Sequence, residues 1–181
     1  MRPNSATARG AWTPSATPNP TAQRSLAAHR AEGAGGKQTA GALNAVGWYH
    51  TLLGQHVQAL DHCREALDLL QREPGYDYGE ADVWDSIGCA HHHLGQYEEA
   101  ATGYRNALAL YRRVGVPYAE ADTMGRLGDT YLSAGRPELA HVEWTEALRI
   151  LERLDHADAE RLRAKLRELP ALDGHRTSSL G

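Results

Sequence analysis

The sequence of 181 residues has no phenylalanine, two cysteines, two methionines and no long run of apolar residues. Without such a run no segment can span a bilayer, so we expect no membrane partner. Arg2 and Arg9 precede no apolar stretch, which predicts that the N-terminus is not a secretory signal. Cys63 and Cys89 are too few and too far apart for a disulfide framework, and reduced thiols are typical of a cytoplasmic protein.

Basic residues are scarce in most of the chain. Residues 1–36 contain four arginines and one glutamate, a net charge of +3, whereas residues 37–181 contain 15 basic and 22 acidic side chains, a net charge of −7. Phosphate binding needs a basic surface, so we expect no direct binding to nucleic acid. The sequence also lacks a Gly-x4-Gly-Lys-Ser/Thr loop, and it predicts no cofactor.

Residues 1–36 and 171–181 have the composition of disordered segments. The first is rich in Ala, Pro, Ser, Thr and Gly, and Pro14, Pro18 and Pro20 interrupt helices. It shows no apolar periodicity before Ser25, so it buries too little apolar surface to offset the entropy of ordering. We predict disorder there, with at most a transient helical turn over Ser25–Ala31.

Residues 37–170 contain three copies of one pattern. Each copy has a glycine after an apolar residue, a second glycine seven residues later, and an alanine five residues after that. The first glycines are Gly47, Gly88 and Gly128, the second are Gly54, Gly95 and Gly135, and the alanines are Ala59, Ala100 and Ala140. A period of 41 and then 40 residues indicates a solenoid with repeats 40–80, 81–120 and 121–160.

Each copy predicts two helices joined by a tight turn. The second glycine suits a C-cap, whereas the first lies inside a helix, where glycine costs about 1 kcal/mol unless a neighbouring helix crosses closely. A terminal helix over residues 158–169, with Leu162, Leu166 and Leu169 on one stripe, is expected to cap the stack. The predicted fold is therefore all-α, with three hairpins and a C-terminal capping helix. The hairpin helices are predicted at Gln38–Leu53, His56–Arg72, Tyr78–Leu94, Tyr97–Val114, Tyr118–Ala134 and Pro137–Leu154.

The repeated residues resemble the tetratricopeptide repeat, whose pattern is W-x2-L-G-x2-Y followed by A-x3-F. The second copy reads Trp84-x2-Ile87-Gly88-x2-His91 and then Ala100-x3-Tyr104. The third reads Met124-x2-Leu127-Gly128-x2-Tyr131 and then Ala140-x3-Trp144, and the first reads Leu43-x2-Val46-Gly47-x2-His50 and then Ala59-x3-Cys63. The resemblance implies a helical scaffold that binds other proteins and is not an enzyme.

A narrower resemblance concerns particular sequence segments of the repeats. Ala42-Leu43-Asn44-x2-Gly47-Trp48, Trp84–Gly95 and Glu120–Thr123 are similar to the C-terminal repeats of actinobacterial antibiotic-regulatory-protein regulators. Those regulators join a DNA-binding winged helix and a nucleotide switch to tetratricopeptide repeats. The resemblance implies a sensor or interaction module linked to transcriptional regulation. A remnant or stand-alone part of a DNA-binding regulator is the alternative that it leaves open.

The family resemblance also implies a binding site, because the first helices of such repeats line a concave groove for a peptide or a partner helix. Trp48, which follows the repeat glycine, is the expected aromatic anchor. Four of the predicted groove residues are aspartates and none is basic, so the groove should be negative and favour a basic or neutral ligand. The predicted groove residues are Asn44, Trp48, Thr51, Leu52, Asp82, Asp85, Cys89, His92, His93, Asp122, Gly125, Asp129, Leu132 and Ser133.

Two chemical alternatives concern the histidine-rich helix. Asp85, Cys89 and His93 share one helical face, and thiolate with imidazole would suit zinc. A structural zinc needs four ligands and no second cluster supplies the rest, so no metal is predicted, and a metal or small-molecule sensor is kept as an alternative. The same three residues could also suggest a catalytic arrangement. They lie along one helix, however, and the N–H groups inside a helix already donate to its own carbonyls, so none is left to bind an oxyanion and we predict no catalysis.

The N-terminal end of the predicted stack has no cap. Ala42, Ala45, Tyr49 and Leu53 are therefore expected to be exposed on the first helix. Apolar surface at the end of a solenoid needs a cover. We predict that Tyr49 and Leu53 meet a second copy, an upstream domain or the Ser25–Ala31 segment folded back, and the sequence does not choose among these.

Overall fold

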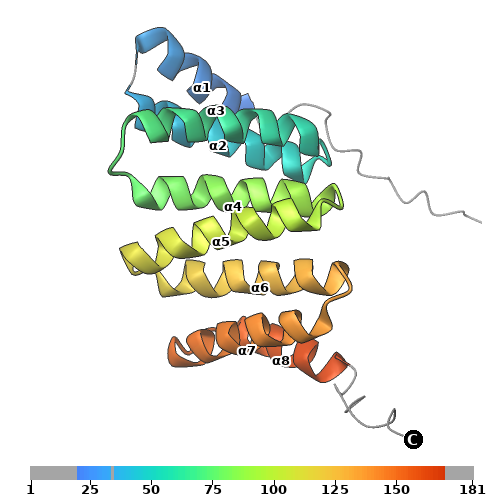
Figure 1. The fold of residues 1–181 in the computed structure, drawn as a ribbon. Coiled ribbons are helices and arrows are strands. Elements are labelled where there is room, and N and C mark those ends of the chain that lie inside the picture. The colour runs from blue at the N-terminus through green and yellow to red at the C-terminus, as the bar shows by residue number, and fades with distance from the viewer. Residues whose placement is uncertain (1–19, 34, 170–181) are drawn as a thin grey trace, which may run out of the picture.

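The computed structural model describes residues 20–33 and 35–169, which form a single stack of α-helices without strands (Figure 1). Three helical hairpins follow one another, as the repeats predict, and each of their six helices begins and ends within two residues of its predicted bounds. Among the described residues, no helix has the length and hydropathy needed to cross a membrane. The helices are α1 (Pro20–Glu32), α2 (Gly36–Leu52), α3 (His56–Arg72), α4 (Asp77–His93), α5 (Tyr97–Val114), α6 (Pro117–Ser133), α7 (Pro137–Arg153) and α8 (Ala159–Glu168).

The turn inside each hairpin is made by a glycine in the left-handed region. Gly54 and Gly95 both have φ of 74°, and Gly135 has φ of 73°. The backbone N–H of the residue after each glycine donates a hydrogen bond back to the end of the first helix. The Arg136 N–H, for example, donates to the Tyr131 carbonyl at 2.8 Å. This geometry satisfies the last carbonyl groups of the first helix, and it confirms the predicted C-caps.

The glycines inside the first helices allow the second helix to approach. A Cβ added at Gly88 would lie 2.8 Å from the ring of Tyr104, and one added at Gly128 would overlap the indole of Trp144. The Trp144 Nε1–H also donates to the Gly125 carbonyl at 3.0 Å. The rings of Tyr104 and Trp144 on the second helices therefore occupy the space that the glycines of the first helices leave.

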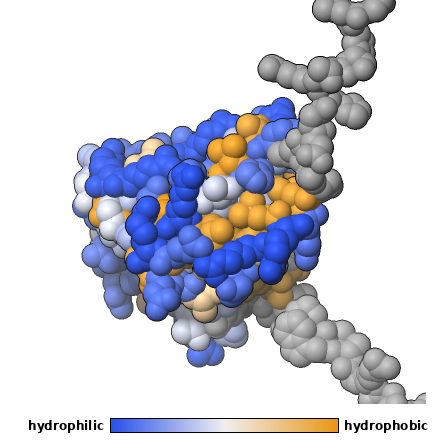
Figure 2. Space-filling model, turned by 90° about the horizontal axis from the view of Figure 1, so that it is seen from below, coloured by the Kyte–Doolittle hydropathy of each residue, from blue (hydrophilic) through white to orange (hydrophobic). Residues whose placement is uncertain are grey.

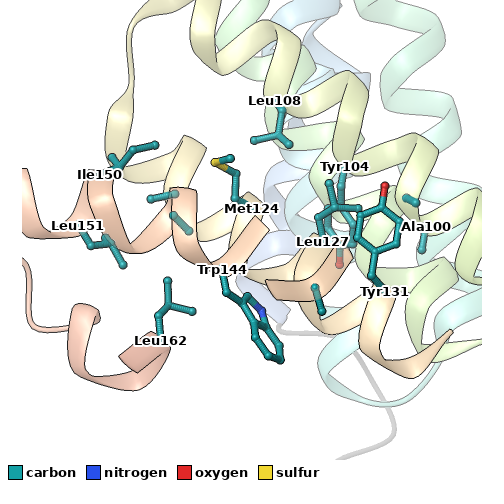
Figure 3. Close-up of a cluster of buried hydrophobic side chains, with 14 of the residues drawn as sticks. Ala100, Tyr104, Leu108, Met124, Leu127, Tyr131, Trp144, Ile150, Leu151 and Leu162 are labelled. Carbon is teal, nitrogen blue, oxygen red and sulfur yellow. The ribbon is translucent and has the colours of Figure 1, made fainter. Parts of the chain in front are cut away.

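Side chains of α5, α6, α7 and α8 form the larger of the main hydrophobic clusters (Figure 3). Trp144 and Leu151 of α7, Leu127 of α6 and Leu162 of α8 are each at most 2% exposed. Burial of such side chains contributes roughly 1.5–3 kcal/mol each, so packing between hairpins holds the stack together.

Residues 20–32 form α1, so the prediction of disorder over residues 1–36 is wrong for this part. Residues 1–19, 34 and 170–181, including the predicted tail, lie outside the described residues. Pro20 occupies the first position of the helix, where a missing N–H is tolerated. Ala22 and Leu26 are buried in the same cluster as residues of α2 and α3, and Arg30 pairs with Glu65 of α3 at 2.5 Å.

Helix α1 changes the expected exposure of the N-terminal end. It packs against α2, and Ala42 of α2 is only 7% exposed. Ala45, Tyr49 and Leu53 are half-buried. The expectation that this end has no helix to cover it is therefore wrong. Of the three covers that the sequence leaves open, the structure shows the fold-back, made by a segment longer than Ser25–Ala31.

The opposite end of the stack is closed by α8, as predicted. Leu162 of α8 is buried, and its Cδ2 would lie 3.8 Å from a Cβ at Gly125 of α6. Viewed from this end, a band of hydrophobic residues lies between hydrophilic ones (Figure 2). Leu166 and Leu169 are only partly buried, so α8 covers this end incompletely.

Candidate functional site

The first helices of the three hairpins line one side of the stack. Helix α4 contacts both α2 and α6 directly. Three cavities follow one another along this side, with volumes of about 290, 210 and 520 Å³. The first and second meet at Arg126, and the second and third meet at Asp129, so the three cavities adjoin one another along one groove.

The first cavity lies between α2, α4 and α6, and we call it the aromatic–acidic cavity. Trp48 of α2 lines it, together with the tyrosines Tyr78, Tyr111 and Tyr118. Asp82 also lines it and accepts a hydrogen bond of 2.6 Å from the Tyr111 hydroxyl. The cavity therefore combines aromatic rings with carboxylates.

Arg126 joins the three first helices across this cavity. Its guanidinium pairs with Asp85 of α4 and, at 2.6 Å, with Asp122 of its own helix. Its Cζ lies 5.7 Å from the ring centroid of Trp48 on α2. Asp85 also accepts a hydrogen bond of 3.0 Å from Thr123. Both oxygens of the buried Asp85 carboxylate are therefore satisfied by α6.

Burial and neighbouring charges together set the pKa values of these groups. It raises the pKa of Asp85 to about 6, against the opposing effects of Arg126 and Thr123. Burial also raises the pKa of Asp82, against the hydrogen bond from Tyr111. Burial lowers the pKa of Arg126, but the carboxylates of Asp85 and Asp122 outweigh it and raise that pKa overall.

The second cavity is lined by Cys89 and His93 of the metal and catalytic alternatives, whereas Asp85 lines the first cavity and pairs with Arg126. His92 lies 2.9 Å from the Thr130 hydroxyl, and His93 stacks on His56 with ring centroids 4.8 Å apart. Burial raises the pKa of the Cys89 thiol, which disfavours a thiolate. No group of three or more metal-binding side chains occurs among the described residues.

The third cavity lies between α6, α7 and α8 and is the most apolar. Leu132, Trp144 and Leu169 line it. At its edge the Lys165 ammonium pairs with Asp129 at 2.5 Å and lies 5.3 Å from the ring centroid of Trp144. The cap helix thus contributes to the groove as well as to stability.

Eleven of the fourteen predicted groove residues line the cavities, and Thr51, Leu52 and Gly125 do not. Thr51 is buried, Leu52 is 63% exposed, and Gly125 lies under Leu162 of the cap helix. The fourteen predicted residues include no basic one, and they miss Arg126 and Lys165, which also line the groove. That the eleven residues bind a partner stays a prediction. They are Asn44, Trp48, Asp82, Asp85, Cys89, His92, His93, Asp122, Asp129, Leu132 and Ser133.

The sequence contains a signal for some of the residues that the prediction missed. Tyr-x-Glu-Ala-Asp occurs twice, at residues 78–82 and 118–122. These copies place Tyr78 and Asp82 on α4, and Tyr118 and Asp122 at the same positions of α6, in one cavity. Tyr111 belongs to a second helix, and no repeat pattern marks it.

The comparison with protein families agrees with the repeat geometry. Residues 38–113 and 79–153 each match the model described as tetratricopeptide repeat, and together they cover more than half of the chain. The chain belongs to the tetratricopeptide-repeat family. A comparison with curated proteins gives no match.

Solved structures share the fold of this tetratricopeptide-repeat protein. A Rap protein complexed with competence and sporulation factor is 20% identical, with a TM-score of 0.65 over 71% of this chain and 36% of the Rap chain. The apo form of RapI is 15% identical, with a TM-score of 0.66 over 72% and 47% of the two chains. BtubC from P. vanneervenii is 21% identical, with a TM-score of 0.60 over 88% and 60%. The chain spans about a third to three fifths of these structures, and the likeness shows the fold alone.

Proposed function

We propose that this chain is a scaffold or sensor module that binds a peptide or a partner helix in the groove lined by α2, α4, α6 and α8. The single observation that carries the proposal is the row of three adjoining cavities, which meet at Arg126 and at Asp129. A row of cavities along a helical stack suits an extended ligand better than a small compact one. The carboxylates near α4 favour a basic or neutral segment.

The comparisons support a protein partner without naming one. Proteins of this repeat family are typically binding scaffolds, and one Rap protein with this fold is described as complexed with competence and sporulation factor. We propose that the chain works in the cytoplasm and is linked to bacterial transcriptional regulation. The support is the resemblance of its repeats to those of antibiotic-regulatory-protein regulators.

The alternatives have less support. A DNA-binding regulator needs a basic surface, and the repeat region is acidic. A metal sensor needs several converging ligands, whereas His92 and His93 are engaged with Thr130 and His56. Catalysis by Cys89 would need a thiolate, which burial disfavours.

Affinity capture with matched variants tests the proposal. Tagged wild type is incubated with extract of the producing cells, beside a groove variant and a control variant whose changed residue lines none of the three cavities. The groove variant is Trp48→Ala/Asp122→Asn, and the control is Val142→Asn, which alters a side chain that is 56% exposed on α7. We expect one protein or peptide to be retained by wild type and control and lost by the groove variant. Equal capture by all three would show that the groove is not the binding site.

A further inference from the structure

Two equivalent carboxylates in the aromatic–acidic cavity have different surroundings. Asp82 and Asp122 stand forty residues apart at the same position of the repeated Tyr-x-Glu-Ala-Asp pattern. Asp122 pairs with Arg126 one turn later at 2.6 Å and with Arg161 at 3.4 Å. Asp82 accepts only the hydrogen bond from Tyr111 and has no ion pair among the described residues.

The difference comes from one residue of the repeat. The position equivalent to Arg126 in the second repeat is Ser86, because both stand four residues after the aspartate and two before the repeat glycine. Ser86 lines the cavity, and its short, neutral side chain gives Asp82 no counter-ion. Asp82 therefore lacks the cation that its counterpart has, and open cavity volume adjoins it.

The walls of this cavity also suit a cation. Tyr78, Tyr111 and Tyr118 line it, and aromatic faces attract ammonium and guanidinium groups. The protein already shows this chemistry at the neighbouring position, where the Arg126 guanidinium lies over Trp48 and between two carboxylates. An external arginine or lysine side chain at Asp82 would likewise meet a carboxylate and aromatic rings.

We infer that the aromatic–acidic cavity binds the cationic side chain of an arginine or lysine in the peptide ligand, with Asp82 as its counter-ion. The inference rests on the proposed function and specifies the recognition chemistry of the same groove. The ligand's cation takes the place that Ser86 leaves open, as Arg126 does in the third repeat. Groove contacts elsewhere add affinity without requiring charge.

A displayed library of random decapeptides provides the probe. Peptides are selected from the library in parallel by binding to immobilised wild type, Asp82→Asn and Asp68→Asn. Asp82→Asn removes the charge but keeps an acceptor for Tyr111, and Asp68→Asn removes an exposed charge on α3 away from the cavity. We expect wild type and Asp68→Asn to enrich peptides with a basic residue at a fixed position, and Asp82→Asn to lose that preference.

A double-mutant cycle then measures the contact. One enriched peptide is synthesised with its basic residue and with norleucine in its place. The replacement should weaken binding to wild type roughly tenfold or more and leave binding to Asp82→Asn nearly unchanged. Ser86→Arg, which supplies an internal guanidinium, should also abolish the preference, and it replaces Asp82→Asn in the cycle if that variant does not fold.

The outcomes separate the two proposals. Enriched peptides without a shared basic position would overturn the cation site and leave the groove function standing. An equal effect of norleucine on wild type and on the Asp82→Asn or Ser86→Arg protein would show that Asp82 is not the counter-ion. If no peptide is enriched by any protein, peptide binding itself is wrong, and the cation site falls with it.

Discussion

The guanidinium carbon of Arg126 lies 5.7 Å from the ring centroid of Trp48, so a residue of the third repeat reaches one of the first across the second. The Arg126 guanidinium also pairs with Asp85 of the second repeat, which is only 6% exposed. This one side chain links α2, α4 and α6 and separates the first two cavities of the groove. It bears on both the stability of the stack and the charge of the groove.

Arg126→Ala should destabilise the protein by about 3–5 kcal/mol, because it leaves the Asp85 carboxylate buried without a partner. Urea unfolding followed by circular dichroism measures the change. Arg149→Ala, which removes an exposed pair with Glu146, should cost less than about 1 kcal/mol. Asp85→Asn should recover much of the loss in the Arg126→Ala background. Equal effects of Arg126→Ala and Arg149→Ala would show that the pair of Arg126 with Asp85 does not stabilise the stack.

Asp85 should make stability depend on pH. Burial raises its folded-state pKa from 3.8 to about 6, so folding favours the protonated carboxyl group. Its contribution is therefore fully present below the unfolded pKa and is lost as pH rises through about 6. Relative to Asp85→Asn, wild type should lose about 2–3 kcal/mol of unfolding free energy between pH 3 and 7. A pH-independent difference, or one of opposite sign, would show that Arg126 dominates the carboxylate.

Gly128→Ala should destabilise the stack by about 1–3 kcal/mol, because the new methyl group overlaps the buried indole of Trp144. Gly41→Ala is the matched control. Gly41 is exposed inside α2, and a Cβ there meets nothing within 4 Å. That change should raise stability by about 0.5–1 kcal/mol, since alanine is the better helix former. Thermal unfolding reports both, and shifts of the same sign would disprove the packing role of Gly128.

Asp155→Gly should stabilise the protein by about 1 kcal/mol. Asp155 has φ of 50° in a turn like those made by the hairpin glycines, and the next residue, His156, donates to the Leu151 carbonyl at 3.0 Å. A side chain in the left-handed region costs roughly 1–2 kcal/mol, which glycine avoids. The reverse change, Gly135→Asp, should lower the melting temperature. A lower melting temperature for Asp155→Gly would mean that its side chain has another stabilising role.

Leu26→Asp should detach α1 from α2 and expose the apolar N-terminal end of the stack. Leu26 is 6% exposed, whereas its neighbour Ala27 is exposed, so Ala27→Asp is the control. We expect concentration-dependent self-association of Leu26→Asp in sedimentation velocity, reversed by Tyr49→Glu/Leu53→Glu. A Leu26→Asp protein that stays monomeric would show that this end does not self-associate.

The sequence by itself determined the features that depend on neighbours along the chain. The hairpin helices and their glycine turns follow from spacings of a few residues, and the forty-residue period predicts their stacking. The same local logic predicted most of the groove residues, because residues on one helical face stay together. It missed α1, although Ala22, Leu26 and His29 form a stripe at helical spacing, because prolines interrupt helices and Pro14, Pro18 and Pro20 stand at or before its start.

Tertiary structure alone decided the chemistry of the groove. The contacts of Arg126 with Trp48 and of Tyr111 with Asp82 join residues 78 and 29 positions apart, and no periodicity specifies such pairs. They depend on the register and crossing of packed helices, which set how far a long side chain reaches beyond its own repeat. From the sequence, the groove carries only negative charges. In the structure, most of its carboxylates are paired with arginine or lysine, whereas Asp82 is not.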